Sequence, residues 1–149
     1  MKNYFINIIS FISIALSYLF GGFSTSLLVL LIFMGIDVVT ALIVAAVFHK
    51  SPKTVSGKIE SNSFLKGIFR KILILIFVVI GNLLDIVLKT EFIKNAVIIS
   101  FIINELLSII ENAVLMGLPI PKVIKQALEI LNNLFSSVFY YFRWFSSSN

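Results

Sequence analysis

The chain of 149 residues contains no cysteine and only one histidine, His49. The absence of cysteine excludes disulfides, thiol nucleophiles and thiolate metal sites. His49 has no histidine or cysteine companion in the sequence, so we interpret it as a solvated residue at a helix end rather than a metal ligand.

Catalytic motifs are missing as well. The sequence has no P-loop, dinucleotide-binding, EF-hand or H-E-x-x-H motif. Asp37 and Asp85 lie on separate predicted helices and lack the flanking motifs of an aspartyl protease. We therefore expect no enzymatic activity, no catalytic residue, no metal site and no cofactor.

Charged residues are scarce, at 13% of the chain against roughly 25% in soluble domains. Hydrophobic residues, in contrast, make up 59%. This composition predicts an all-α integral membrane protein. We expect three to four transmembrane helices plus a C-terminal amphipathic helix, which together form a single membrane domain over residues 1–149.

Four hydrophobic stretches reach, or nearly reach, the length that crosses a bilayer. Residues 24–48 form the clearest one, and 72–88 and 96–116 are the next two predicted transmembrane helices. The N-terminal stretch 4–20 is at the lower length limit, so it either crosses the membrane or lies in its interface. A cleaved signal peptide is disfavoured because Lys2 is the only charge before this stretch and no typical cleavage site follows it.

A basic segment, residues 49–71, separates the second and third hydrophobic stretches. We expect a loop here, and the alternative for residues 64–71 is the beginning of the next helix at the membrane surface. By the positive-inside rule this loop and the C-terminus are cytoplasmic, which predicts a multi-pass protein of the cytoplasmic membrane. The net charge of +5 is concentrated here, so we expect contact with anionic lipid headgroups and no nucleic-acid binding. The basic residues that set this topology, against the single acid Glu60, are Lys50, Lys53, Lys58, Lys66, Arg70 and Lys71.

A helix break is predicted where Gly117, Pro119 and Pro121 follow the last hydrophobic stretch. Glycine suits a helix C-terminus, and proline suits the residues after it and the first turn of a new helix. Residues 121–145 then carry polar side chains on one face and apolar ones on the other. We expect an amphipathic helix on the cytoplasmic membrane surface; the alternative is a helix that packs on sister subunits.

Polar side chains interrupt the predicted transmembrane helices, where each acid costs roughly 2.5 to 3.5 kcal/mol. Asp37 lies near the middle of its stretch with Thr40 on the same side, and no basic residue within that stretch neutralises it. Asn82 and Asp85 are spaced so that the amide can hydrogen-bond the carboxyl.

The densest group of polar residues lies in the stretch 96–116. An arc of roughly 120° around this helix contains Asn104, Glu105, Ser108, Glu111 and Asn112. Such an arc either joins helices through hydrogen bonds or forms a face that meets water in some state of the protein.

The same residues resemble the C-terminal signature of the phage lysis and toxin secretion holins, NE..SI.EN....G.P.P. The matching positions are Asn104-Glu105, Ser108-Ile109, Glu111-Asn112, Gly117, Pro119 and Pro121. The likeness continues more loosely upstream and covers about residues 30–131. The chain departs from the family at Ala41, where glycine is more common, and in its aromatic C-terminal end.

This resemblance implies a holin, which oligomerises in the membrane and forms a pore or lesion. Such a lesion releases a lytic enzyme or a large protein toxin, a cargo that it need not touch. The residues themselves favour self-association, because a monomer of three or four helices offers too few faces to shelter Asp37, Asp85, Glu105 and Glu111. A homo-oligomer can bury these groups when closed and hydrate them when open.

Two other classes of function remain open. The first is a small proton-coupled transporter or ion-channel subunit, in which the same acids line a path. The second is a passive membrane scaffold. If the acidic face must hydrate, Glu105→Gln and Glu111→Gln are predicted to assemble normally and permeabilise late, because a neutral face is cheaper to keep dry.

Overall fold

The chain folds into helices joined by short connections. The computed structural model describes residues 2–54, 56–124, 126 and 130. None of these residues is in a strand, which confirms the all-α prediction. The helices are α1 (Lys2–Leu19), α2 (Thr25–Ile43) with its π-helical continuation η1 (Val44–Phe48), α3 (Ser61–Leu88) and α4 (Ile93–Leu115).

Three helical segments are long and apolar enough to cross a membrane. They are Thr25–Phe48, Ser61–Leu88 and Ile93–Leu115, and the shortest of them has 23 residues. At 1.5 Å per residue this helix extends about 35 Å, which exceeds the roughly 30 Å of hydrocarbon in a bilayer. α1 contains a shorter apolar stretch, Ile6–Leu19.

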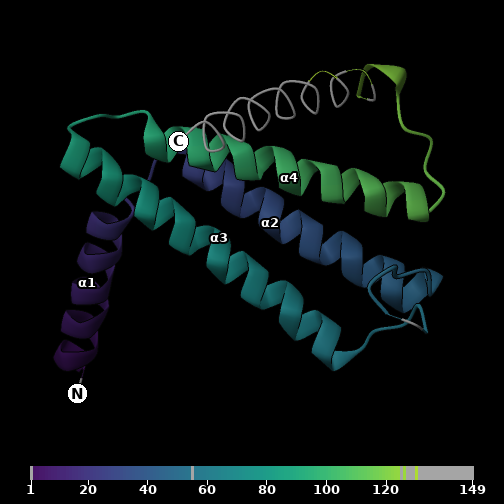
Figure 1. Cartoon of the computed structure of the whole chain (residues 1–149). Helices are drawn as coiled ribbons and strands as arrows, with labels where there is room; N and C mark the ends of the chain where they lie inside the picture. The colour runs from purple at the N-terminus through teal and green to yellow at the C-terminus, as the bar shows by residue number, and fades with distance from the viewer. Residues whose placement is uncertain (1, 55, 125, 127–129, 131–149) are drawn as a thin grey trace, which may run out of the picture.

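The three long segments form a bundle in which α4 packs against both α2 and α3 (Figure 1). Side chains of α2 bond to α4 near both ends, through Ser26 to Asn95 and through Thr40 to Asn112, so these two helices run in the same direction. α3 runs in the opposite direction. The buried apolar core between the three helices consists of Leu27, Leu30, Met34, Ile74, Val78 and Ile98.

The outer surface of the bundle is also apolar. Large side chains such as Val39, Phe69 and Val87 are more than half exposed. In water this surface would be strongly unfavourable, but in a membrane protein it faces lipid. The bundle is therefore held together less by an apolar core than by close helix packing and by the polar contacts described below.

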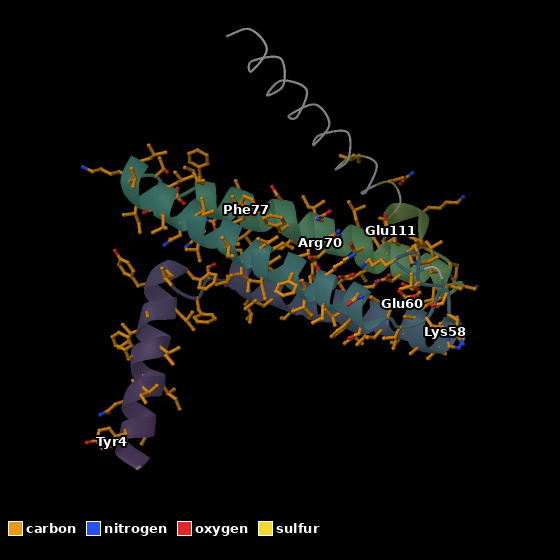
Figure 2. The ribbon with its side chains drawn as sticks, turned by 60° about the horizontal axis from the view of Figure 1, so that its bottom comes forward. Tyr4, Lys58, Glu60, Arg70, Phe77 and Glu111 are labelled. Atoms are coloured by element: carbon orange, nitrogen blue, oxygen red, sulfur yellow. The ribbon has the colours of Figure 1, made fainter. Side chains whose placement is uncertain are left out.

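α1 stands apart from the bundle and runs across its direction in both views (Figures 1 and 2). Its carbonyl end is attached by two polar side chains. Asn82 donates to the carbonyls of Tyr18 and Leu19 at 3.3 and 3.0 Å, and Lys94 donates to that of Gly21 at 3.1 Å. Gly21 has φ +63°, and a Cβ there would lie 2.1 Å from the Asn82 amide oxygen, so this turn requires glycine.

α3 begins within the predicted basic loop. Of the expected loop 49–71, the second half, from Ser61, is helical, which agrees with the alternative that residues 64–71 begin the next helix. Lys66 is exposed near the start of this helix, so its charge is compatible with a helical end that lies outside the hydrocarbon. Arg70, one turn further on, is also exposed and lies at the border of the apolar stretch 72–88. Lys71 points inward instead, and its contacts are described in the next subsection.

The chain leaves α4 at the predicted break. α4 ends at Leu115, and Gly117 adopts φ +83°, the left-handed conformation that commonly ends a helix. Of the predicted amphipathic helix 121–145, residues 122–124, 126 and 130 are helical, and the remainder lies outside the described residues.

Candidate functional site

A polar cluster lies within the apolar bundle and joins all three of its helices. Lys71 of α3 donates from its ammonium to Asp37 Oδ2 of α2 at 2.8 Å and to Glu105 Oε2 of α4. All three side chains are largely hidden, with 14%, 10% and 6% of their surfaces exposed, respectively. One ammonium group therefore connects two carboxylates on two other helices.

Two uncharged side chains complete this central cluster. Asn112 of α4 donates from Nδ2 to Asp37 Oδ1 at 3.2 Å and to Thr40 Oγ1 at 3.0 Å. Thr40 donates in turn to the backbone carbonyl of Asp37 at 3.1 Å. In the part of the chain that the structure describes, no buried side-chain nitrogen or oxygen lacks a hydrogen-bond partner. We use the name central cluster for Asp37, Thr40, Lys71, Glu105 and Asn112.

The electrostatics of the central cluster favour a tightly closed bundle. Charges removed from water lose several kcal/mol of hydration each, and only a partner at short distance offsets that loss. Asp37 and Glu105 both obtain such a partner in Lys71. Since the cluster has two carboxylates for one ammonium, it carries a surplus of one negative charge when all three groups are ionised.

One expectation from the sequence is corrected by this geometry, and another is completed. The monomer was expected to offer too few faces to shelter the acids, but it buries Asp37, Asp85 and Glu105 by itself and leaves only Glu111 exposed among the four. No base lies within the stretch of Asp37, as the sequence shows, and the neutralising base is Lys71 on another helix. The sequence reasoning did not link Lys71 to Asp37 because Lys71 directly precedes the apolar stretch 72–88 and was counted with the basic loop.

The polar arc of α4 is divided by the packing. Glu105 and Asn112, seven residues apart, are buried at 5% and 8% exposure. Asn104 and Glu111, also seven residues apart, are exposed, and Ser108 between them is half-buried. The structure thus brings Glu105 and Asn112 together with Asp37 and Thr40, and it leaves Asn104 and Glu111 outside the central cluster.

Asp85 organises the opposite end of the bundle. Its carboxylate accepts from Thr90 Oγ1 at 2.6 Å and from the backbone N–H groups of Ile93 and Lys94 at 3.0 and 2.8 Å. It therefore satisfies free N–H groups at the start of α4, where a negative charge is favourable. The expected bond between Asn82 and Asp85 is absent, because Asn82 bonds to the end of α1 instead.

A cavity of about 80 Å³ lies beside the central cluster, between α2, α3 and the 49–60 connection. Asp37 and Lys71 contribute to its lining, and so do Lys53, Lys58 and Glu60 of the basic connection. The remaining lining is mainly apolar. The cavity therefore extends from the Asp37–Lys71 ion pair to the polar end of the bundle, where Lys58 and Glu60 are labelled in Figure 2. Among the described residues, no three carboxylate or imidazole groups gather as metal ligands would.

The remaining predicted site residues lie at the ends of the helices. Lys50, Lys53 and Lys58 are in the connection between η1 and α3, and Pro119 and Pro121 follow α4.

Comparison with known proteins agrees with this picture. The model of the bacteriophage holin family matches residues 14–133. An uncharacterized protein of Halalkalibacterium halodurans is 42% identical over 123 residues, which cover 78% of this chain and 85% of that protein. An uncharacterized 14.9 kDa protein of Clostridium perfringens is 36% identical, with 78% and 84% covered, and an uncharacterized protein of Listeria monocytogenes is 35% identical, with 77% of each covered. No solved structure matches. A family model that matches most of the chain, together with three apolar helices able to span a bilayer, shows that this membrane protein belongs to the bacteriophage holin family.

Proposed function

We propose that this protein oligomerises in the cytoplasmic membrane and opens a pore or lesion through which a lytic enzyme or a large protein toxin leaves the cell. The observation that carries the proposal is the central cluster, a set of charged and polar side chains closed inside an apolar bundle. A membrane protein that only needed to be stable would be served as well by apolar packing, because buried ion pairs add little net stability.

The central cluster supplies two alternative states for the same groups. In the closed bundle, Lys71 and Asn112 satisfy Asp37 and Glu105 from within the chain. When several copies associate and the helices separate, water replaces these contacts and solvates the released charges. Opening the bundle costs the free energy of the ion pairs, and it gains the free energy of hydrating the released charges. Because these two contributions oppose each other, the free-energy difference between the closed and open states is smaller than either contribution alone.

The orientation in the membrane is part of this proposal. The basic connection between η1 and α3, with Lys50, Lys53 and Lys58, lies on the cytoplasmic side, as does the C-terminus. Since the chain has no cysteine, Ser56→Cys and Ser147→Cys each provide a single labelling site. Both should react with a membrane-impermeant thiol reagent from the cytoplasmic side only, and labelling from opposite sides would contradict the topology.

The function is tested by the size of what passes the membrane. On induction, cells should release a folded cytoplasmic reporter enzyme and take up a large dye, and growth should stop abruptly. The measurement is a time course of both signals at a known amount of membrane-inserted protein. Retention of the reporter by cells that have lost their ion gradients would contradict the proposed large lesion.

A narrow path for protons or cations is the second candidate. It is favoured by the surplus carboxylate of the central cluster and by the cavity that reaches Asp37 and Lys71. Reconstituted vesicles separate the candidates, because a narrow path passes cations selectively and retains large dextrans, whereas a lesion releases both. A passive scaffold would produce neither signal.

A further inference from the structure

A second polar group lies on the outside of the bundle, in the groove between α3 and α4. Phe77 of α3 and Phe101 of α4 contact each other across this groove, with ring centroids 6.1 Å apart. Arg70 lies seven residues before Phe77, and Ser108 lies seven residues after Phe101. Because seven residues are close to two helical turns, Arg70 lies on the face of α3 that carries Phe77, and Ser108 lies on the face of α4 that carries Phe101. Both residues are two turns nearer the end of the bundle that carries the basic connection.

Asn104 and Glu111 flank Ser108 on the same side of α4. The four residues Arg70, Asn104, Ser108 and Glu111 form what we call the groove patch. Arg70, Asn104 and Glu111 are exposed, and Phe77, Arg70 and Glu111 follow one another along the bundle in Figure 2. The two ion pairs found among the described residues both belong to Lys71, so Arg70 and Glu111 have no ion-pair partner there.

Such a patch is unfavourable on a helix surface that faces lipid. An exposed guanidinium, carboxylate and amide in or next to hydrocarbon need partners that lipid tails do not provide. An anionic headgroup would suit Arg70 alone, but Glu111 would repel it. The patch carries one charge of each sign together with uncharged donors and acceptors, so the surface most complementary to it is the same patch on another copy.

We propose that the groove patch is the contact through which two copies of this chain first associate in the membrane. The two copies are related by a two-fold axis along the membrane normal, so that Arg70 of each faces Glu111 of the other. A two-fold contact uses the same surface on both copies and requires self-complementarity, which the opposite charges provide. Arg70 and Glu111 follow each other closely along the bundle in Figure 2, so in such a pair the two charges come to a similar depth, which the long side chain of arginine can reach.

This inference deepens the proposed function, because it names the surface through which oligomerisation begins. It rests on the proposed function only where it says that assembly leads to a pore or lesion. The central cluster stays intact in the pair, since Glu105 and Asn112 are buried inside the bundle, whereas Asn104 and Glu111 are exposed on the adjoining face of α4. The pair is therefore a closed assembly, and opening is a separate later step.

The absence of cysteine makes a direct test possible. Ser108→Cys places one thiol near the two-fold axis, and Val39→Cys places one at a similar depth on α2, where the side chain is 56% exposed. In oxidised membranes Ser108→Cys should give a covalent dimer that does not extend to higher species, and Val39→Cys should give little. Equal crosslinking of the two variants would mean random collision and would overturn the proposal.

Charge exchange then tests the pairing itself. In the Ser108→Cys background, Arg70→Glu or Glu111→Arg gives each copy two like charges, and we expect about tenfold less dimer. Mixing these two variants in one membrane, with tags of different size, should restore crosslinking as the mixed dimer only. Two results would overturn the proposal. If crosslinking returns in the Arg70→Glu/Glu111→Arg double variant but not in the mixture, the two charges pair within one chain. If either single variant crosslinks as the wild type does, the two charges do not pair.

Milder variants guard against a failure of membrane insertion. Arg70→Gln and Glu111→Gln leave the topology-setting charge almost unchanged and should each lower the dimer about two- to threefold. Reporter release is measured in parallel. A dimer with the expected charge dependence and no release would contradict the proposed function alone, whereas release without this dimer would contradict the groove patch alone.

Discussion

Glu105 and Glu111 are carboxylates on the same helix, six residues apart, and their surroundings are opposite. Glu105 is 5% exposed and bonds to Lys71, whereas Glu111 is exposed and has no ion-pair partner among the described residues. Six residues turn an α-helix through about 600°, which places the two side chains about 120° apart. That angle is enough for one to enter the bundle while the other remains outside it.

The polar face of α4, which the sequence pattern showed as one arc, therefore consists of two groups of residues with different roles. The inward residues, Glu105 and Asn112, hold α2, α3 and α4 together within one copy. The outward residues, Asn104 and Glu111, are available to a second copy. Each inward residue thus has an outward residue of the same type on the same helix, which serves as its matched control.

The largest effect is expected from Lys71→Met, which leaves Asp37 and Glu105 buried without their counter-ion. Breaking a buried ion pair on one side costs about 3–5 kcal/mol. We expect a large loss of thermal stability in detergent, measured by the temperature at which the monodisperse peak disappears in size-exclusion chromatography. Lys66→Met, on the exposed side of α3, should leave this temperature nearly unchanged.

A compensated variant shows whether charge is the cause. Lys71→Met combined with Asp37→Asn and Glu105→Gln removes all three charges of the central cluster and should recover much of the lost stability. No recovery would mean that Lys71 contributes by packing rather than by neutralising the carboxylates.

A smaller effect is expected from Asn112→Leu, which removes the donor shared by Asp37 and Thr40. Leaving buried acceptors without this partner costs about 1–3 kcal/mol. The same substitution at the exposed Asn104 should change stability by less than about 0.5 kcal/mol. Equal losses at the two positions in a thermal-unfolding measurement would contradict the division of α4 into inward and outward residues.

The smallest effects on stability, and the sharpest on timing, are expected from the glutamine variants. Glu105→Gln removes the surplus negative charge and keeps an acceptor for Lys71, so the bundle should stay folded and permeabilise late with normal dimer. Glu111→Gln should also permeabilise late, but the normal assembly expected from the sequence no longer applies to it: Glu111 is exposed in the groove patch, so the variant should give less dimer. The check is a time course of dye entry beside the amount of crosslinked dimer at matched protein levels. Wild-type timing in both variants would mean that the acids act only as contacts between helices.

Much of the fold follows from local features of the sequence. The hydrophobic stretches mark the three long helices, and Gly117 with the following prolines marks the end of α4. The residues of the central cluster other than Lys71 were also recognisable one by one, because a polar side chain inside an apolar stretch is costly wherever it lies. Composition and helical periodicity suffice for these conclusions, since each depends on neighbours within a few turns.

Only the tertiary structure decided which polar residues meet. Lys71 reaches Asp37 and Glu105, each 34 residues away, and Asn82 reaches the end of α1, more than 60 residues away. These contacts depend on the rotation and axial register of whole helices against one another. Neither quantity is encoded in the period of a single helix, because the same polar arc can be turned inward or outward at similar local cost. The packing of both α2 and α3 against α4 fixed that rotation, and with it the buried place of Glu105 and the exposed place of Glu111.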